Sequence, residues 1–284
     1  MKKGMILFPP EWLPINPYSS MPMLVGQLHQ AGYPVVCKDS NLEFFDYVLD
    51  KNHFERILDG KDGAKDSPFG RERRETVKNH LEAAVETLKR GENFYQVDCY
   101  KEAMETIEDA LAMVSESYPG QKLSLYDFSD VRFNWDYRNL VKICSNQMKN
   151  MFYDYYMEQM EYWKNAGVDY ICVTMPCYTQ LIPGFTLMYL LKKYTTITVC
   201  AGGNIITRLS EGIRANKDLL DTFCDYLLMG DGEDSIVKFA DFLHGKCGSD
   251  QVPGMIWKEG YHLFANPVDK ERHMENIALP VFHG

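Results

Sequence analysis

The chain has 284 residues, of which 45% are hydrophobic and 25% are charged, proportions that are ordinary for a soluble globular protein. This length allows one large α/β domain with an insertion, or two ordinary domains. Lys and Arg number 30 against 40 Asp and Glu, and the net charge of −10 argues against a nucleic acid or an anionic membrane as the main partner.

The N-terminal residues MKKGMILFPPEW contain two lysines, but their apolar run stops at Pro9. That run is too short for a signal peptide or a membrane span. The eight cysteines are mostly far apart, and without a secretory signal they are best interpreted as reduced thiols of a cytoplasmic protein. Cys172 and Cys177 fit neither a CxxC redox motif nor zinc-ribbon spacing, so we expect them in the core or in a loop.

The first forty residues are predicted to form a strand, a loop, a helix and a second strand. Residues 5–8 form an apolar run that ends at two prolines, which predicts a buried strand followed by an irregular loop over residues 11–18. Ser19 or Ser20 can cap the helix that follows. Residues 33–37 (YPVVC) predict the second strand, and we expect the next four residues, KDSN, to form a polar turn.

From residue 42 to about residue 167 the chain shows helical spacing, many charges and almost no strand signal. The segments ETVKNHLEAAVETLKR, YKEAMETIEDALAMVSESY and YRNLVKICSNQMKNMFYDYYMEQMEYWKN carry apolar residues at three- and four-residue intervals. Residues 42–167 are therefore predicted to be a helical insertion, whose aromatic residues serve helix packing. The remaining residues, 1–41 and 168–284, are predicted to form one domain.

After residue 167 strands return and alternate with helices. VDYICVTM, TITVCAGG and DYLLMG predict strands, with helices expected over residues 183–193, from about residue 210, and over residues 234–244. This alternation indicates βαβ units and a parallel sheet. MIWKEGYHLF alternates like a β-hairpin. We therefore predict an α/β fold: a Rossmann-like parallel sheet flanked by helices, with a long helical insertion and a C-terminal β-hairpin.

Ligands of an open parallel sheet bind beyond the carboxyl ends of its strands, so the strand ends are where a site is expected. Two of them, AGGN and GDGE, contain glycines, which permit a positive φ and a close approach of a ligand to the backbone. Each turn taken alone is equally well explained as a tight corner between a strand and a helix.

The turn GDGEDS leaves several interpretations open. Gly230 and Gly232 match the first two glycines of a dinucleotide fingerprint, but the third position is Ser235 and the turn comes late in the chain. The pattern also lacks the alternating oxygen ligands of a calcium loop. Glu233 and Asp234 have a structural reason to be there, because an acidic residue at a helix N-terminus stabilises the helix by about 0.3–1 kcal/mol. No HExxH, GxSxG or Walker motif predicts a self-sufficient enzyme.

Taken in order, these motifs resemble the cobalamin-binding domain at the N-terminus of cobalamin-dependent radical SAM proteins. Domains of that family share a strand ending in a small hydroxyl residue, a Gly-Gly pair after the next strand, and a G-(E/D)-G-E turn after the following one. VDYICVT, TITVCAGG and LLMGDGED match these features here, and the opening ILFPPEWLPINPYSSMPMLVGQLHQAGYPVV is similar to the first βαβ unit of the family.

The resemblance implies a sheet that holds the corrin ring over its C-terminal edge and directs the nucleotide tail between strands and helices. The implied cofactor-binding residues are Pro10, Glu11, Trp12, Leu13, Thr174, Met175, Cys177, Tyr178, Gln180, Gly202, Gly203, Asn204, Gly230, Asp231, Gly232 and Glu233. The glycines would admit the ring and its amide side chains, Thr174 would bond the tail, and Asp231 and Glu233 would accept hydrogen bonds from amides or ribose hydroxyls. Backbone N–H groups at helix starts would meet the phosphate.

The chain departs from the family pattern in two respects. The DxHxxG motif is absent and residues 9–19 contain no histidine, so we predict cobalamin binding without histidine ligation to cobalt. The CxxxCxxC ligand set of a radical SAM cluster is also absent, so SAM and a [4Fe-4S] cluster are expected only in a missing C-terminal or partner domain. The chain ends at NIALPVFHG, about where such proteins enter the radical SAM barrel, and we expect a truncated form, a split protein or a domain that acts in trans.

The leading hypothesis is a cobalamin-binding domain of a radical SAM enzyme that supports methyl transfer or related radical chemistry and is not catalytically complete alone. Its substrate, a small molecule or a peptide, stays open. The alternative is a cobalamin-free scaffold or substrate-recognition domain of the same fold. A stand-alone nucleotide-dependent enzyme is a third interpretation, which the misplaced glycine fingerprint disfavours.

Overall fold

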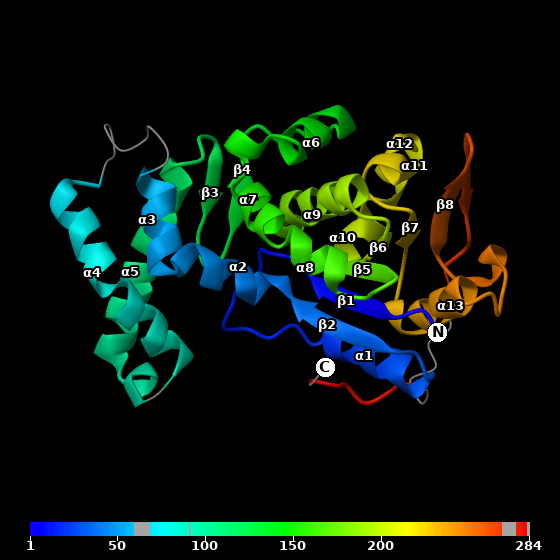
Figure 1. The fold of residues 1–284 in the computed structure, drawn as a ribbon, viewed down its shortest axis with the longest axis horizontal. Coiled ribbons are helices and arrows are strands. Elements are labelled where there is room, and N and C mark those ends of the chain that lie inside the picture. The colour runs from blue at the N-terminus through cyan, green and yellow to red at the C-terminus, as the bar shows by residue number, and fades with distance from the viewer. Residues whose placement is uncertain (60–68, 91, 269–276, 283–284) are drawn as a thin grey trace.

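The computed structural model describes residues 1–59, 69–90, 92–268 and 277–282, and a sheet with helices on both faces forms its centre (Figure 1). Its strands are β1 (Gly4–Phe8), β2 (Val35–Asp39), β5 (Tyr170–Thr174), β6 (Thr198–Gly202), β7 (Tyr226–Leu228), β8 (Met255–Glu259) and β9 (His262–Ala265). Their spatial order within the described chain is β2-β1-β5-β6-β7-β8-β9. The strands from β2 to β7 are parallel, whereas β8 and β9 run antiparallel. The predicted α/β class, parallel sheet and C-terminal hairpin are confirmed.

The two faces of the sheet carry different helical layers because side chains alternate along each strand. Cys172 and Leu228 face one layer, formed by α1 (Ser20–Gln30) and α13 (Gly232–Leu243). Val173 and Leu227 face the opposite layer, which contains α2 (Ser40–Leu49), α7 (Met151–Glu158) and α9 (Leu181–Tyr194). Figure 1 shows α1 below the sheet and α9 above it. The remaining helices around the sheet are α6 (Tyr137–Cys144), α8 (Met160–Asn165), α10 (Asn204–Arg208), α11 (Ser210–Ala215), α12 (Asp218–Thr222) and the single turns η3 (Gln147–Lys149), η4 (Tyr178–Gln180) and η5 (Ser249–Gln251).

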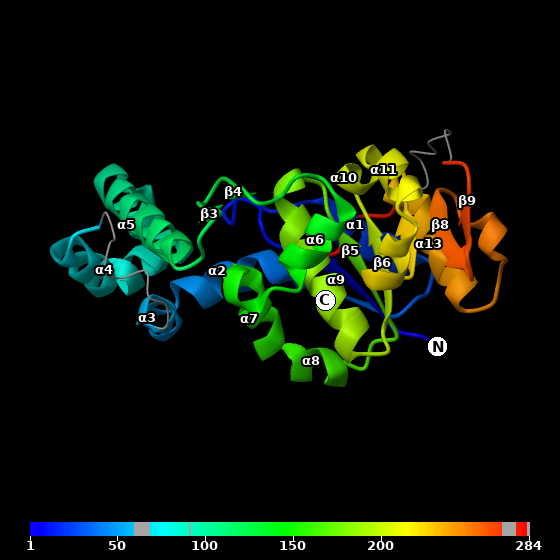
Figure 2. The ribbon, with the colours of Figure 1, turned by 90° about the horizontal axis from the view of Figure 1, so that it is seen from above.

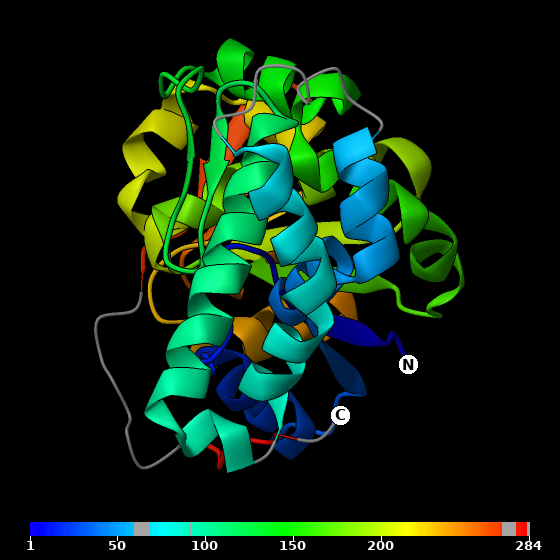
Figure 3. The same cartoon turned by 90° about the vertical axis from the view of Figure 1, so that its left-hand side faces the viewer.

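An arm of helices extends beyond the β2 side of the body (Figures 1 and 2). It consists of α3 (Lys51–Asp59), α4 (Arg71–Lys89), η2 (Glu92–Tyr95), α5 (Val97–Glu116) and the small antiparallel pair β3 (Gln121–Leu123) and β4 (Phe128–Asp130). Figure 3 views the arm end-on and shows α4 and α5 side by side. Leu81 and Leu111 lie in the same buried apolar cluster as Leu7 of the sheet, so the arm is attached through a continuous core.

Two details of the predicted elements are wrong. The residues KDSN do not form a turn, because Lys38 and Asp39 complete β2 and α2 begins at Ser40. The Asp39 carboxylate accepts a hydrogen bond of 3.0 Å from the Leu42 N–H and thereby caps α2, so polar residues that suggested a turn are a helix start. The insertion also contains β3 and β4, which are too short to show an alternating pattern in the sequence.

The long aromatic segment is broken into α6, η3, α7 and α8, and asparagine side chains cap the starts of η3 and α7. The Asn150 side chain accepts from the Phe152 N–H at 3.1 Å, and that of Asn146 accepts from the Lys149 N–H at 3.2 Å. Helix α7 and most of α2 belong to residues 42–167 and yet cover the sheet. The division into residues 1–41 with 168–284 and an insertion over 42–167 stays a prediction. Within the described ranges, no helix combines the length and the apolar composition that crossing a membrane requires.

Candidate functional site

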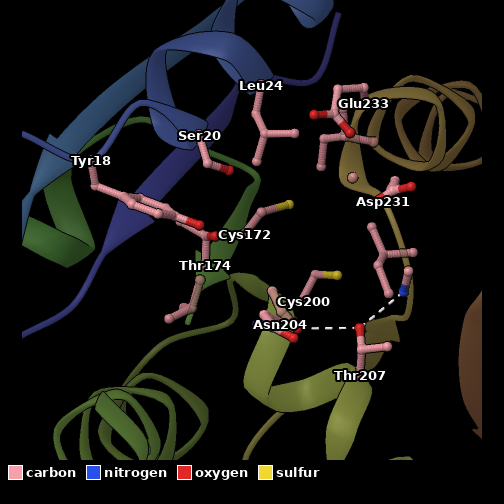
Figure 4. A pocket seen from close by; sticks show the side chains of 17 residues that line it. Tyr18, Ser20, Leu24, Cys172, Thr174, Cys200, Asn204, Thr207, Asp231 and Glu233 are labelled. Carbon is pink, nitrogen blue, oxygen red and sulfur yellow. Dashed lines mark hydrogen bonds between the residues drawn. The ribbon is translucent and has the colours of Figure 1, made fainter. Parts of the chain in front are cut away.

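A cavity of about 430 Å³ lies at the C-terminal ends of β5, β6 and β7, next to the starts of α1 and α13 (Figure 4). It is lined by Tyr18, Ser20, Leu24, Cys172, Val173, Thr174, Cys200, Gly202, Gly203, Asn204, Thr207, Leu228, Gly230, Asp231, Gly232, Glu233 and Ile236. This is the edge where parallel α/β sheets bind ligands. In the sheet, β2 lies on one side of β1, whereas β5, β6 and β7 follow one another on the other side. The topological switch point is therefore between β1 and β5, and the cavity lies beside it.

Side chains alternate between the two faces of a strand, and those that point toward α1 and α13 form the floor of the cavity. Cys172 of β5 and Cys200 of β6 are register partners, and both lie in the apolar cluster on that face together with Leu228. Burial raises the pKa of the Cys200 thiol well above its usual value, and the neighbouring Cys172 adds to the shift. The Cys200 thiol therefore stays uncharged at neutral pH, so its part of the floor resembles an apolar surface.

The two glycine turns form the rim of the cavity and are tied together by one threonine. Gly203 has a φ of 106°, and a Cβ there would lie 2.5 Å from the carbonyl oxygen of Met175, so only glycine fits against the end of β5. The Thr207 hydroxyl donates to the Gly203 carbonyl at 3.2 Å and accepts from the Gly230 N–H at 2.9 Å. Figure 4 shows these two bonds as dashed lines.

The turn GDGE is both a corner and a wall of the cavity. Gly230 has a φ of 85°, Asp231 precedes the first residue of α13, and Glu233 lies in the first turn of that helix. The N-terminal N–H groups of a helix lack intrahelical partners and carry a partial positive charge. Figure 4 shows Asp231 and Glu233 across the cavity from Tyr18 and Ser20. This wall therefore presents carboxylates next to helix N–H groups.

The opposite wall comes from the loop and helix that follow β1. The Tyr18 ring stacks on Phe8 with a centroid distance of 4.8 Å, which fixes its position. Burial raises the pKa of the Tyr18 phenol, a hydrogen bond with Ser20 opposes the shift, and the charge of Glu233 adds to it. The phenol therefore stays protonated at neutral pH and can donate a hydrogen bond.

Eight of the residues singled out in the sequence meet in the lining of the cavity: Thr174, Gly202, Gly203, Asn204, Gly230, Asp231, Gly232 and Glu233. The other eight lie outside that lining: Pro10, Glu11, Trp12, Leu13, Met175, Cys177, Tyr178 and Gln180. Sequence reasoning missed Tyr18, Ser20, Leu24, Cys172, Val173, Cys200, Thr207, Leu228 and Ile236. Because side chains alternate between the two faces of a strand, the sequence can place Cys172, Cys200 and Leu228 on one face of the sheet. It identifies them as cavity residues only once the face that carries the cavity is known.

Of the eight residues outside the lining, Glu11 and Gln180 take part in hydrogen bonds that join the loops after β1 and β5. The buried Gln180 side chain donates to the Pro9 carbonyl at 2.8 Å and accepts from the Cys177 N–H at 3.2 Å. The Thr179 hydroxyl donates to the Glu11 carbonyl at 3.0 Å. These bonds satisfy buried backbone groups, so the loops are held rigidly beside the cavity.

Comparisons with protein-family models, with curated proteins and with solved structures each gave no match. The part of the chain that the structure describes also contains no group of three His, Cys, Asp or Glu side chains that could hold a metal ion. The fold and the cavity together define a Rossmann-like α/β protein with a candidate ligand site at the carboxyl ends of its strands.

Proposed function

We propose that the chain is a cobalamin-binding domain that serves a cobalamin-dependent radical SAM enzyme. The observation that carries this proposal is the convergence of three strand ends on one cavity. Thr174, the Gly202-Gly203 pair and the turn from Gly230 to Glu233 are more than fifty residues apart from first to last and line the same space. The resemblance in the sequence rests on the same three segments.

The residues of the cavity fit the tail of a corrinoid better than its ring. A cavity of about 430 Å³ falls within the range of about 300–1,000 Å³ that is usual for small-ligand sites, and is too small to enclose a whole cobalamin. Thr174, which is 5% exposed, and Asn204 and Thr207 offer hydrogen-bonding groups, and the start of α13 suits a phosphate. We propose that the tail enters the cavity and that the ring stays outside, over the strand ends.

Residues 9–19, the loop after β1, contain no histidine, so we propose that cobalamin is held without histidine ligation to cobalt. Bound cobalamin would supply a methyl group on cobalt or assist radical chemistry, and this domain would bind and orient it. The chain carries no radical SAM motif, so we propose that SAM and the [4Fe-4S] cluster belong to a barrel joined in cis or acting in trans.

Retention of hydroxocobalamin tests the proposal. The protein is incubated with hydroxocobalamin and desalted, and a stoichiometric cobalamin absorption band is expected to stay with it. Gly232→Val is expected to weaken binding at least tenfold, because a Cβ at Gly232 already meets the Leu24 side chain at 3.0 Å. Gly212→Val is the matched control, since a Cβ there meets nothing within 4 Å, and it is expected to bind normally.

Two outcomes would contradict the proposal. A folded wild-type protein that retains no cobalamin would favour the cobalamin-free scaffold instead. Thermal stabilisation by NAD or ATP, without stabilisation by hydroxocobalamin, would favour a nucleotide-dependent protein, because a ligand that binds the native state raises its melting temperature. Electron paramagnetic resonance of the Co(II) form tests the ligation, and nitrogen splitting from a protein imidazole would contradict it.

A further inference from the structure

The sheet ends in a strand whose outer edge has no partner among the described residues. β9 (His262–Ala265) is the last strand in the spatial order of the sheet, and in the described chain it pairs with β8 alone. Figure 2 shows the two strands at the end of the molecule opposite the helical arm. His262, Phe264 and Ala265 are exposed, and Leu263 is partly buried. The backbone groups of such an edge can pair with a further strand.

The pairing with β8 determines which backbone groups of β9 point outward. Asn266 donates its N–H to the Met255 carbonyl at 2.9 Å, and these two residues are opposite each other when the register of β8 and β9 is extended by one residue. Hydrogen-bonded and non-hydrogen-bonded pairs alternate along an antiparallel ladder, so Phe264 is the next residue that bonds to β8. The N–H and C=O groups of Leu263 and Ala265 therefore point away from β8, and the described residues provide no hydrogen-bond partner for them.

β9 also lacks the charged side chains that usually prevent an exposed strand from pairing with another chain. The other strands at sheet edges in the described chain each carry charges, which are Lys38 and Asp39 in β2, Lys122 in β3 and Asp130 in β4. Residues 261–267 (YHLFANP) contain no Asp, Glu, Lys or Arg. Large apolar side chains are exposed here instead, since Tyr261 is 84% exposed, Phe264 40% and Val268 39%.

We propose that β9 pairs antiparallel with β9 of a second copy of this chain, so that the two sheets become one continuous sheet. A two-fold axis through Phe264 places Leu263 opposite Ala265 of the second copy, and Ala265 opposite Leu263 of the second copy. Both are then hydrogen-bonded pairs, so the outward N–H and C=O groups of these residues all gain partners. This inference goes beyond the proposed function and does not depend on it.

A second copy fits this edge because the segment is complementary to itself about the axis. Phe264 meets Phe264 of the second copy in a non-hydrogen-bonded pair, where facing side chains come closest. Each Phe264 ring stacks on Trp257 with a centroid distance of 5.2 Å, so the axis joins two stacked aromatic pairs. Residue 261 lies opposite residue 267 of the second copy, so every pair in this register comes from the segment without Asp, Glu, Lys or Arg. A two-fold interface of this kind uses the same surface on both copies.

Analytical ultracentrifugation of charge variants at Phe264 tests the register, because only in this register does residue 264 face itself. The interface is small, so we expect the wild type to dimerise with a dissociation constant of about 10–100 µM and to be mostly dimeric at about 200 µM. Phe264→Lys and Phe264→Glu each place two like charges opposite each other and are each expected to weaken dimerisation at least tenfold. An equimolar mixture of the two variants is expected to associate at least tenfold more tightly than either variant alone, since opposite charges then face each other.

Tyr126→Lys is the matched control, because it replaces another exposed aromatic side chain with lysine, on the β3–β4 turn far from β9 in the sequence. Tyr126 is 62% exposed, and the variant is expected to dimerise as the wild type does. Circular dichroism verifies that all four proteins are folded.

Amide hydrogen exchange followed by NMR observes the paired edge directly. The amides of Leu263 and Ala265 are expected to exchange about three- to sevenfold more slowly in the wild type at the same concentration than in Phe264→Lys, because only the monomer exposes them. The Asn266 amide bonds to Met255 in the monomer already and is expected to change little. The proposal would be overturned if the folded wild type stayed monomeric at that concentration, or if mixing the two charge variants restored no association. A dimer whose Leu263 and Ala265 amides exchanged at the rate of the monomer would also overturn it.

Discussion

The two sides of the switch point between β1 and β5 are built in different ways. On the side of β5, β6 and β7, the cavity is lined by short local segments, namely the ends of the three strands and, after β6 and β7, the first residues of the following helix. On the side of β1, the charges of Asp127 of the β3–β4 turn and Glu108 of α5 act on the buried Glu11 carboxyl, although both residues lie about a hundred residues away along the chain. A local motif is visible in the sequence, whereas a contact between distant segments is visible only in the fold.

The largest expected effect concerns the β1 side and the pH dependence of stability. The pKa of Glu11 is about 8 in the folded protein against an ordinary value of 4.5, because burial disfavours its charged form. Both states hold the proton below pH 4.5, so stability is complete there. As pH rises toward 8 the unfolded state loses this proton first, and the free energy of unfolding falls by up to about 1.4 kcal/mol per pH unit.

Urea unfolding of the wild type and of Glu11→Gln between pH 5 and pH 8 measures this term. Gln cannot titrate, so the variant is expected to gain stability relative to the wild type as pH rises, by about 3–4 kcal/mol at pH 8. The difference between the two proteins isolates Glu11 from other titrating groups. If the free energies of unfolding of the two proteins changed with pH in the same way, Glu11 would ionise near its ordinary pKa. The buried carboxyl would then no longer distinguish the β1 side from the cavity side.

The next largest effect concerns the backbone on the cavity side. Gly203→Ala is expected to destabilise the protein by about 2–3 kcal/mol, because the new Cβ would lie 2.5 Å from the Met175 carbonyl oxygen. Gly32→Ala is the matched control: Gly32 also has a positive φ, of 81°, but a Cβ there meets nothing within 4 Å. It is expected to cost only about 1–2 kcal/mol. Equal losses in urea unfolding would mean that φ alone, and not the contact with β5, requires glycine at position 203.

The sequence predicted what local patterns determine. The order of strands and helices after residue 167 follows from their hydrophobic periodicity, and the glycines at 202, 203, 230 and 232 marked one wall of the cavity before the fold was known. Asp39 misled the prediction, because a capping aspartate and a turn aspartate have the same local sequence signal.

The rest depended on tertiary contacts. Tyr18 carries no motif, and it reaches the cavity only because its ring stacks on Phe8. The loop around Glu11 was expected among the cofactor-binding residues from its position after β1, but which residues face it depends on where the β3–β4 turn is placed. That turn belongs to a segment with no strand signal, so no local pattern in the sequence links it to Glu11.

The smallest expected effect concerns the link between the two glycine turns. Thr207→Val keeps the shape of the side chain but removes the hydroxyl that donates to the Gly203 carbonyl and accepts from the Gly230 N–H. We expect a loss of about 1–2 kcal/mol in urea unfolding, since a hydrogen bond contributes about 1 kcal/mol and the Gly230 N–H is left without its partner.

Thr106→Val is the matched control, because the Thr106 hydroxyl bonds only the Glu102 carbonyl within an exposed helix turn, and its loss is expected to be within about 0.5 kcal/mol. If the two glycine turns act as one wall, Thr207→Val should also weaken hydroxocobalamin binding. Unchanged hydroxocobalamin binding in a destabilised Thr207→Val protein would show that the link between the turns serves stability alone.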